Sequence, residues 1–152
     1  MSTINQSNKP VVLIDARGPR YSAAITSVVL ALALITESSY LIGFQFAVFL
    51  SAVLFGLRRS IYGFIYRNLI QPRLSGPVPS ENEAAPRFAQ LIGALFAATA
   101  LLGGFTGNTT VFLIATSFAL GAAFLNAAFG FCLGCQFYII LFRVKSRITS
   151  RN

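Results

Sequence analysis

Charged residues are missing from two long stretches of this chain, and this feature constrains the fold more than any other. Residues 21–57 carry a single charge, on Glu37, and residues 88–142 carry none. A helix needs roughly 20 apolar residues to cross a bilayer, within a range of about 17–25. The first stretch therefore accommodates two short spans, and the second accommodates two with several residues left over.

The composition agrees with this division. Hydrophobic residues make up 55% of the 152 residues and charged residues only 11%, whereas charged residues are about a quarter of a soluble domain. We therefore expect an all-α membrane protein of one domain, residues 1–152, with four transmembrane helices arranged as two hairpins. The expected segments are a first hairpin at about 19–57, a cytoplasmic interfacial helix and loop at 58–85, a second hairpin at about 86–130, and a cysteine turn with an interfacial C-terminal segment at 130–152.

Basic residues predict the orientation of the spans. The net charge is +8, and all twelve lysines and arginines lie before, between or after the two stretches. The turns expected inside the hairpins, 36–40 and 103–109, contain none. Because basic residues concentrate in cytoplasmic loops, we expect a multi-pass protein of a bacterial inner membrane with both termini in the cytoplasm. The same placement favours contact with anionic lipid headgroups and argues against nucleic-acid binding.

The only two cysteines lie three residues apart in the sequence Gly130-Phe131-Cys132-Leu133-Gly134-Cys135. This spacing brings both sulfurs to one side of a helical turn, where they can form a disulfide or exchange one with a partner. Cys132 and Cys135 are therefore the candidate pair for thiol redox exchange or for sulfur relay, and the sequence does not say which attacks and which resolves. On a cytoplasmic face the resting state is expected to be the dithiol.

Two other interpretations of the cysteines stay open. They can be inert, buried residues of an accessory or structural subunit in a larger membrane complex, since free cysteine behaves as a small hydrophobe. They can also belong to a transporter of a small solute. A metal site is not indicated, because the chain has no histidine and two thiolates supply only half of a tetrahedral zinc site. The sequence indicates no cofactor.

Five further residues are predicted to support the cysteine pair. Gly130 and Gly134 favour a break in the last apolar segment, because each weakens a helix by roughly 1 kcal/mol relative to alanine; the alternative is one continuous helix that carries the cysteines at depth. Arg20 and Arg87 open two helices after a proline, so they are expected at the same end of the bundle. Together with Asp15 they are predicted to form a polar cluster near the cysteine turn.

The two halves of the chain resemble each other. Gly18-Pro19-Arg20-Tyr21 opens the first hairpin and Ala85-Pro86-Arg87-Phe88 opens the second. The hairpins end in Phe55-Gly56 and Phe129-Gly130. Ile61-Tyr62 with Ile65-Tyr66-Arg67 in the first half resembles Phe137-Tyr138 with Leu141-Phe142-Arg143 in the second. This shared order suggests an internal duplication of a helical hairpin.

Three motifs, around Asp15-Ala16-Arg17-Gly18-Pro19-Arg20, Pro86-Arg87-Phe88-Ala89-Gln90 and Gly130–Cys135, occur in the order found in a bacterial membrane family known as domain of unknown function 4395. The sequence resembles that family over roughly residues 11–143. The resemblance implies a four-span integral membrane protein with a Gly-Phe-Cys-x-x-Cys element. Members tend to be encoded near thioredoxin-like and sulfurtransferase proteins, so a partner of either kind is expected.

Overall fold

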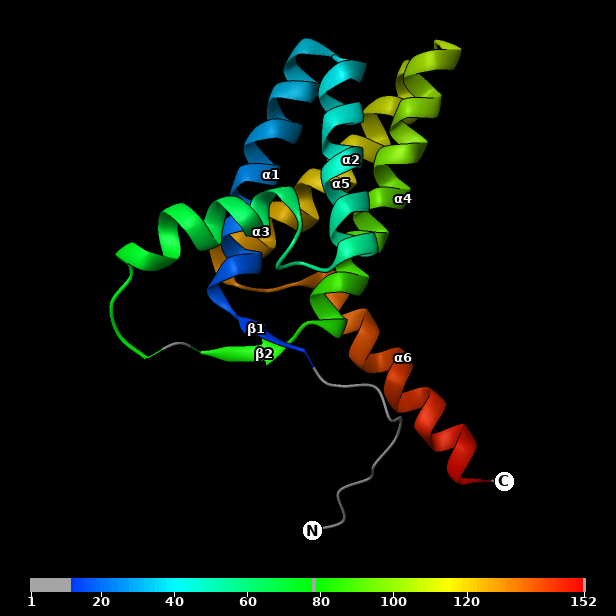
Figure 1. Cartoon of the computed structure of the whole chain (residues 1–152). Helices are drawn as coiled ribbons and strands as arrows, with labels where there is room; N and C mark the ends of the chain where they lie inside the picture. Colours follow the sequence, from blue (N-terminus) through cyan, green and yellow to red (C-terminus); the bar gives the residue numbers. More distant parts are fainter. Residues whose placement is uncertain (1–11, 78, 152) are drawn as a thin grey trace.

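The computed structural model describes residues 12–77 and 79–151, and within these it is mainly helical (Figure 1). Lys9, one of the basic residues behind the predicted orientation, lies outside the described residues. The elements in chain order are β1 (Leu13–Asp15), α1 (Arg17–Thr36), α2 (Ser39–Phe55), α3 (Ile61–Ile65), a π-helical turn η1 (Tyr66–Ile70), a 3₁₀ turn η2 (Gln71–Arg73), β2 (Ser80–Asn82), α4 (Ala84–Thr106), α5 (Thr109–Phe129) and α6 (Leu133–Ser150).

Four of these helices form two hairpins whose turns lie at the same end of the molecule, at the top of Figure 1. Helices α1, α4 and α5 are long and apolar enough to cross a membrane, whereas α2 is an apolar helix of 17 residues. Large apolar side chains such as Leu32, Leu54 and Leu95 face outward. An apolar exterior of this kind suits contact with lipid rather than with water.

Both hairpin turns are shorter than the sequence suggested. In the first, Glu37 adopts a left-handed conformation and the Ser38 hydroxyl accepts a hydrogen bond from the backbone N–H of Leu41. In the second, Gly107 is left-handed at φ 74° and Asn108 caps α5. The prediction that residues 103–106 belong to this turn is wrong. Gly103 stays in α4 because its missing side chain allows a close approach, and a Cβ there would lie 2.7 Å from the backbone nitrogen of Phe112.

The core of the bundle combines small and large apolar residues. Ala33, Ala97 and Ala100 are almost wholly buried beside Leu30 and Ile42. Small side chains let membrane helices approach closely, and dispersion contacts then hold them together. The hairpins also pack crosswise, since α1 lies against α5 and α2 lies against α4.

A short polar chain crosses this core. Gln45 is fully buried; its amide nitrogen donates to the Thr26 hydroxyl at 3.2 Å, and its amide oxygen accepts from the Tyr62 hydroxyl at 2.9 Å. Tyr62 belongs to α3, which lies across the end of the bundle (Figure 1). These hydrogen bonds therefore link α3 to both helices of the first hairpin.

A two-stranded antiparallel sheet, which the sequence analysis did not predict, joins the segments before α1 and α4. Ile14 pairs with Glu81 at its centre. Beyond the strands the backbone N–H of Ala16 donates to the Pro79 carbonyl at 2.8 Å, and that of Glu83 donates to the Val12 carbonyl at 3.0 Å. The segment before α1 is thus paired with the loop that precedes α4.

Helix α6 leaves the bundle on the side of the sheet, at the lower end of Figure 1. None of its residues is buried. The C-terminal segment expected within 130–152 forms one long helix, because the apolar sequence continues from Leu133. The first turns of α6 contact α4, and the rest extends away from the bundle.

Candidate functional site

The cysteines lie where the chain leaves α5. That helix ends at Phe129, and Gly130 adopts a left-handed conformation at φ 67°. The N–H of Gly130 donates to the Asn126 carbonyl at 3.0 Å and that of Phe131 donates to the Leu125 carbonyl at 3.4 Å. The first of these bonds is the 5→1 bond of the αL motif, in which a helix ends at a left-handed glycine. The predicted break at Gly130 is therefore confirmed.

Cys132 caps α6, and its side chain contacts the first turn. Its Sγ accepts a hydrogen bond from the backbone N–H of Cys135 at 3.2 Å. The two residues form a disulfide with their Cα atoms 5.2 Å apart, and both side chains are partly exposed. The sequence analysis expected a dithiol at rest; the structure holds the oxidised member of the same couple.

Gly134 does not break the helix, contrary to its predicted role, because it is needed inside α6. A Cβ at this position would lie 2.6 Å from both Cα and Cβ of Ala89 in α4. One turn later the Tyr138 ring packs on Phe88, with ring centroids 5.7 Å apart. The glycine thus allows the cysteine-bearing turn to lie directly against the backbone of α4.

Arg20 lies beside the cysteine turn. Its Nε donates to the Ala127 carbonyl at 3.2 Å and its Nη2 to the Ala128 carbonyl at 3.3 Å. These carbonyls belong to the last turn of α5, where no helical N–H is available to them. A positive charge at this end also complements the helix dipole. Arg20 therefore holds the end of α5 from which the cysteine turn begins.

Arg87 makes the equivalent contact in the other hairpin. Its guanidinium donates to the Val53 carbonyl, with Nε at 2.8 Å, and to the Leu54 carbonyl at 3.4 Å. Glu83, just before α4, accepts a hydrogen bond from the backbone N–H of Leu57. Arg20 and Arg87 thus lie at helix ends as predicted, but each binds carbonyls of a different helix.

The sequence model of one protein family, described as a domain of unknown function (DUF4395), matches residues 14–143. That span is most of the chain. The chain belongs to this family. Neither a curated protein nor a solved structure matches it.

In this DUF4395 chain Asp15 lies apart from both arginines of the predicted cluster. Its carboxylate accepts from the Arg17 guanidinium at 3.1 Å and from the Tyr66 hydroxyl at 2.8 Å. Among the described residues no hydrogen bond or ion pair joins Asp15, Arg20 and Arg87 to one another. Sequence reasoning missed both partners of Asp15; the signal for Arg17 was its place two residues further along the same turn.

These contacts change the acidity of both side chains. Burial alone raises the pKa of Asp15, but the hydrogen bonds from Arg17 and Tyr66 outweigh it and leave the pKa below its ordinary value. Burial first, and then the bond to Asp15, raises the pKa of Tyr66 to about 12. The carboxylate therefore stays charged and the phenol neutral over the physiological range.

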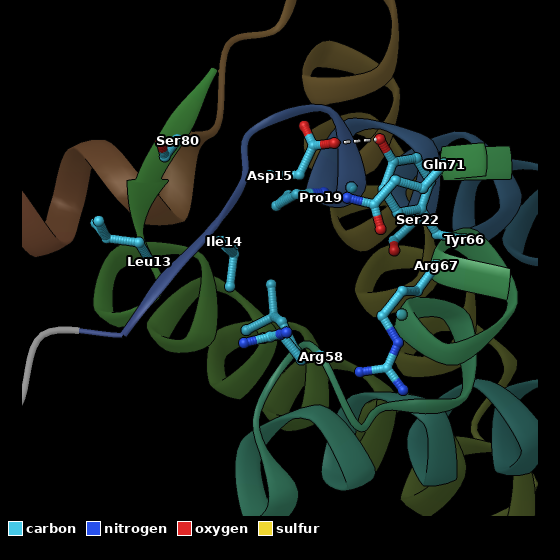
Figure 2. Close-up of a pocket in the computed structure, with 13 residues that line it drawn as sticks. Leu13, Ile14, Asp15, Pro19, Ser22, Arg58, Tyr66, Arg67, Gln71 and Ser80 are labelled. Atoms are coloured by element: carbon cyan, nitrogen blue, oxygen red, sulfur yellow. Dashed lines mark hydrogen bonds between the residues drawn. The ribbon is translucent and has the colours of Figure 1, made fainter. Parts of the chain in front are cut away.

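Asp15 and Tyr66 line a cavity of about 300 Å³ between β1, α1 and α3 in this family member (Figure 2). Figure 2 shows the Arg58 and Arg67 side chains extending into the same space from the far side. The cavity lies on the first half of the chain, away from the cysteines. Among residues 12–77 and 79–151, no group of three or more side chains is suited to hold a metal ion.

Proposed function

We propose that this protein carries out thiol–disulfide exchange at a membrane, with Cys132 and Cys135 as the reactive pair. The observation that supports this most directly is the partly exposed disulfide on the first turn of α6. A soluble thioredoxin-like protein with two thiols is the proposed partner, and a sulfurtransferase protein is the alternative partner. One partner thiolate attacks the disulfide, a mixed disulfide forms, and the partner's second thiol releases the reduced pair.

The start of α6 suits this chemistry. After reduction, the N–H groups of the first helical turn lie next to the Cys132 sulfur and stabilise negative charge on it. Arg20 adds a cation at the adjacent end of α5. Gly130 and Gly134 fix the turn, one by its left-handed backbone and the other by its contact with α4. Asp15 and Arg87 support the same end of the bundle from a greater distance.

The proposed topology has four spans, with the cysteine turn at the cytoplasmic edge of a bacterial inner membrane. Helix α5 has 21 residues, which at 1.5 Å per residue is about 31 Å, close to the thickness of the hydrocarbon core. Helix α2 is at the short end of the range for a span. Its upper end lies beside that of α1 in Figure 1, and it runs alongside α1 and α4, which supports counting it as the fourth.

The proposed duplication of the hairpin rests on contacts that come in pairs. Arg20 and Arg87 are each the fourth residue of a helix, and each binds two carbonyls at the end of the other hairpin. The sheet has Ile14 opposite Glu81, with matching hydrogen bonds on either side. Such an exchange is expected of two copies related by an axis along the membrane normal.

A cysteine trap tests the function. Cys135→Ser leaves a lone Cys132 thiol that can hold a partner as a mixed disulfide, and Cys132→Ser does the same for Cys135. We expect one of the two variants to capture a cellular dithiol protein in membranes, and the capture to disappear on reduction. If neither variant captures any protein, and the wild-type disulfide does not exchange with added thioredoxin, the proposed function is wrong.

A second candidate is an accessory subunit of a larger membrane complex. Helix α6 favours it, because large apolar side chains such as Phe137, Ile140 and Phe142 are more than half exposed. A subunit role predicts that the protein co-purifies with other membrane proteins in mild detergent, and that both single serine variants co-purify equally well. Thiol exchange predicts that any association depends on the cysteines.

A further inference from the structure

We propose that the Cys132–Cys135 pair exchanges electrons with a lipid-soluble quinone, which binds in a cavity beneath the cysteine turn. This inference rests on the proposed function, because it names the second substrate of the same pair. A cavity of about 390 Å³ lies between α1, α4, α5 and the start of α6. Cys132 is part of its wall, whereas Cys135 is not. The cavity therefore adjoins the disulfide on the side of Cys132.

The wall of the cavity suits an aromatic ring that carries oxygen atoms. Four phenylalanines from different parts of the chain line it, namely Phe49, Phe96, Phe118 and Phe137. Aromatic side chains favour stacked or edge-on contacts with a flat ring. A ring of quinone size fits the space, since small-molecule sites typically enclose about 300–1,000 Å³.

Two amides supply the polar groups that such a ring needs. Gln90 of α4 and Asn126 of α5 both line the cavity, and neither side chain bonds to another described residue. Polar side chains inside membrane helices are costly, and for this reason they often mark a substrate site. An amide N–H can donate to a quinone carbonyl, and its C=O can accept from the quinol hydroxyl. The pair of amides thus suits both redox states of the ring.

A groove continues from the cavity along the outer face of α5. It encloses about 500 Å³ and shares Phe118, Ala122 and Leu133 with the cavity. The groove is open beside Gly121, where a Cβ would meet no atom within 4 Å. The groove extends as far as Leu113 and is mainly apolar. It would hold the hydrocarbon tail of a ligand whose ring lies beside Cys132, which distinguishes a quinone from a small polar oxidant.

The reaction is a two-electron exchange. The two thiols of the reduced pair lose two electrons and two protons as the Cys132–Cys135 bond forms. The quinone takes up both, so its two carbonyl oxygens become the hydroxyls of a quinol. The regenerated disulfide can then accept electrons from the next partner dithiol. The proposed direction of electron flow is from the soluble partner through the cysteines to the membrane.

The test uses the reduced full-length protein in phosphatidylcholine nanodiscs with decylubiquinone. The ring of this quinone is fully substituted, so the thiols cannot add to it. We expect loss of the quinone absorbance and loss of two thiols for each quinone reduced. Asn126→Leu and Gln90→Leu should each slow the reaction about tenfold at limiting quinone, the effect of one lost hydrogen bond of about 1.4 kcal/mol. Asn68→Leu, which alters an exposed amide outside the cavity, should not slow it.

Further arms separate this inference from the proposed function. Gly121→Phe should block the groove and slow the reaction with decylubiquinone more than the reaction with a tailless ubiquinone ring. Exchange of the disulfide with thioredoxin, measured for each variant, shows that the pair is folded and competent. If the pair exchanges with thioredoxin but reduces no quinone, the quinone inference is overturned and the proposed function remains. If it exchanges with neither, both are wrong.

Discussion

The chain leaves the bundle at two points, after α2 and after α5. These two exits have the same arrangement of contacts. Each helix ends at a glycine, Gly56 or Gly130, and each end is bound by an arginine from the other hairpin. The next helix then begins with a side-chain cap. Ser60 Oγ accepts from the Gly63 N–H at 3.1 Å, and Cys132 Sγ accepts from the Cys135 N–H at 3.2 Å.

The exits differ in the chemistry at the cap and in what lies behind it. Ser60 is buried, and its hydroxyl cannot take part in thiol–disulfide exchange. Cys132 is partly exposed and forms a disulfide with Cys135. Tyr66 after the first exit is buried against Tyr21 and bonded to Asp15. After the second exit the corresponding helix extends away from the bundle. The first exit thus has only a buried hydroxyl at its cap, whereas the second presents the partly exposed Cys132–Cys135 pair.

The largest expected effect comes from the cysteines themselves. Cys132→Ser or Cys135→Ser should abolish turnover with thioredoxin, because the Cys132–Cys135 disulfide can no longer form and a mixed disulfide with the partner cannot be resolved by the second cysteine. Ser60→Ala, at the matching cap, should leave the exchange rate unchanged and cost about 1 kcal/mol of stability. Insulin-reduction assays coupled to thioredoxin, together with thermal unfolding in detergent, measure both quantities. Loss of exchange in Ser60→Ala at wild-type stability would show that the two exits are not functionally distinct.

Gly134→Leu should separate the second exit from α4. Its side chain would overlap the backbone of Ala89, and overpacking of this kind costs about 1–3 kcal/mol. We expect a lower unfolding temperature and a looser contact between Phe88 and Tyr138, which a spin-label distance across α4 and α6 would report. Ala98→Leu, which adds the same side chain at another position of the bundle, is the control variant. A distance that does not change would contradict this packing.

Arg20 and Arg87 should contribute equally to the stability of the protein but unequally to the reactivity of its cysteine thiols. Arg20→Gln and Arg87→Gln each remove hydrogen bonds from charged nitrogen to helix-end carbonyls, at a cost of about 1–2 kcal/mol. Only Arg20 adjoins the turn that carries the cysteines, so only Arg20→Gln should slow thiol alkylation at neutral pH. The measurement is the rate of maleimide labelling of the reduced protein against pH. Equal rates in both variants would remove the cationic role of Arg20.

Loss of the tyrosine hydroxyl after each exit should change the stability of the protein by a smaller amount. Tyr66→Phe loses the bond to Asp15 and should cost about 1–2 kcal/mol, whereas Tyr138→Phe keeps its ring contact with Phe88 and should cost less. The bond also predicts a pH dependence. Because the pKa of Asp15 is lowered from its ordinary 3.8, its stabilising effect is present above that pH and is lost as the pH falls below it. Acid unfolding of wild type and Asp15→Asn tests this.

The sequence predicted the hairpins and the break at Gly130 because both follow from length. Residues without charge can be counted against the thickness of a bilayer, and the surplus lies at the cysteine motif. The sheet was not predicted because β1 and β2 have only three residues each. The strands are also far apart in the sequence, and they meet only once the helices between them have folded. Gly103 was assigned to a turn because local sequence does not reveal that a glycine is needed for close packing.

The sequence suggested the proposed duplication, but it paired residues in the last part that lie one helical turn away from those that the ring contacts suggest. The sequence matched Tyr62 with Tyr138, whereas the ring contacts place Tyr66 with Tyr21 and Tyr138 with Phe88. Apolar helices tolerate such a shift because residues four apart lie on the same face. The contacts between the arginines and backbone carbonyls could not be predicted either, because every residue has a carbonyl and its residue type does not show which one accepts.

The central claim is that Cys132 and Cys135 lie at the membrane edge in a form that a soluble partner can reach. Labelling of the reduced protein in native inverted membrane vesicles, with a membrane-impermeant maleimide, tests it most directly. The account predicts that both cysteines are labelled in folded protein, faster as the pH rises, and that right-side-out vesicles protect them. Labelling only after detergent denaturation would show an inert buried pair and contradict the account.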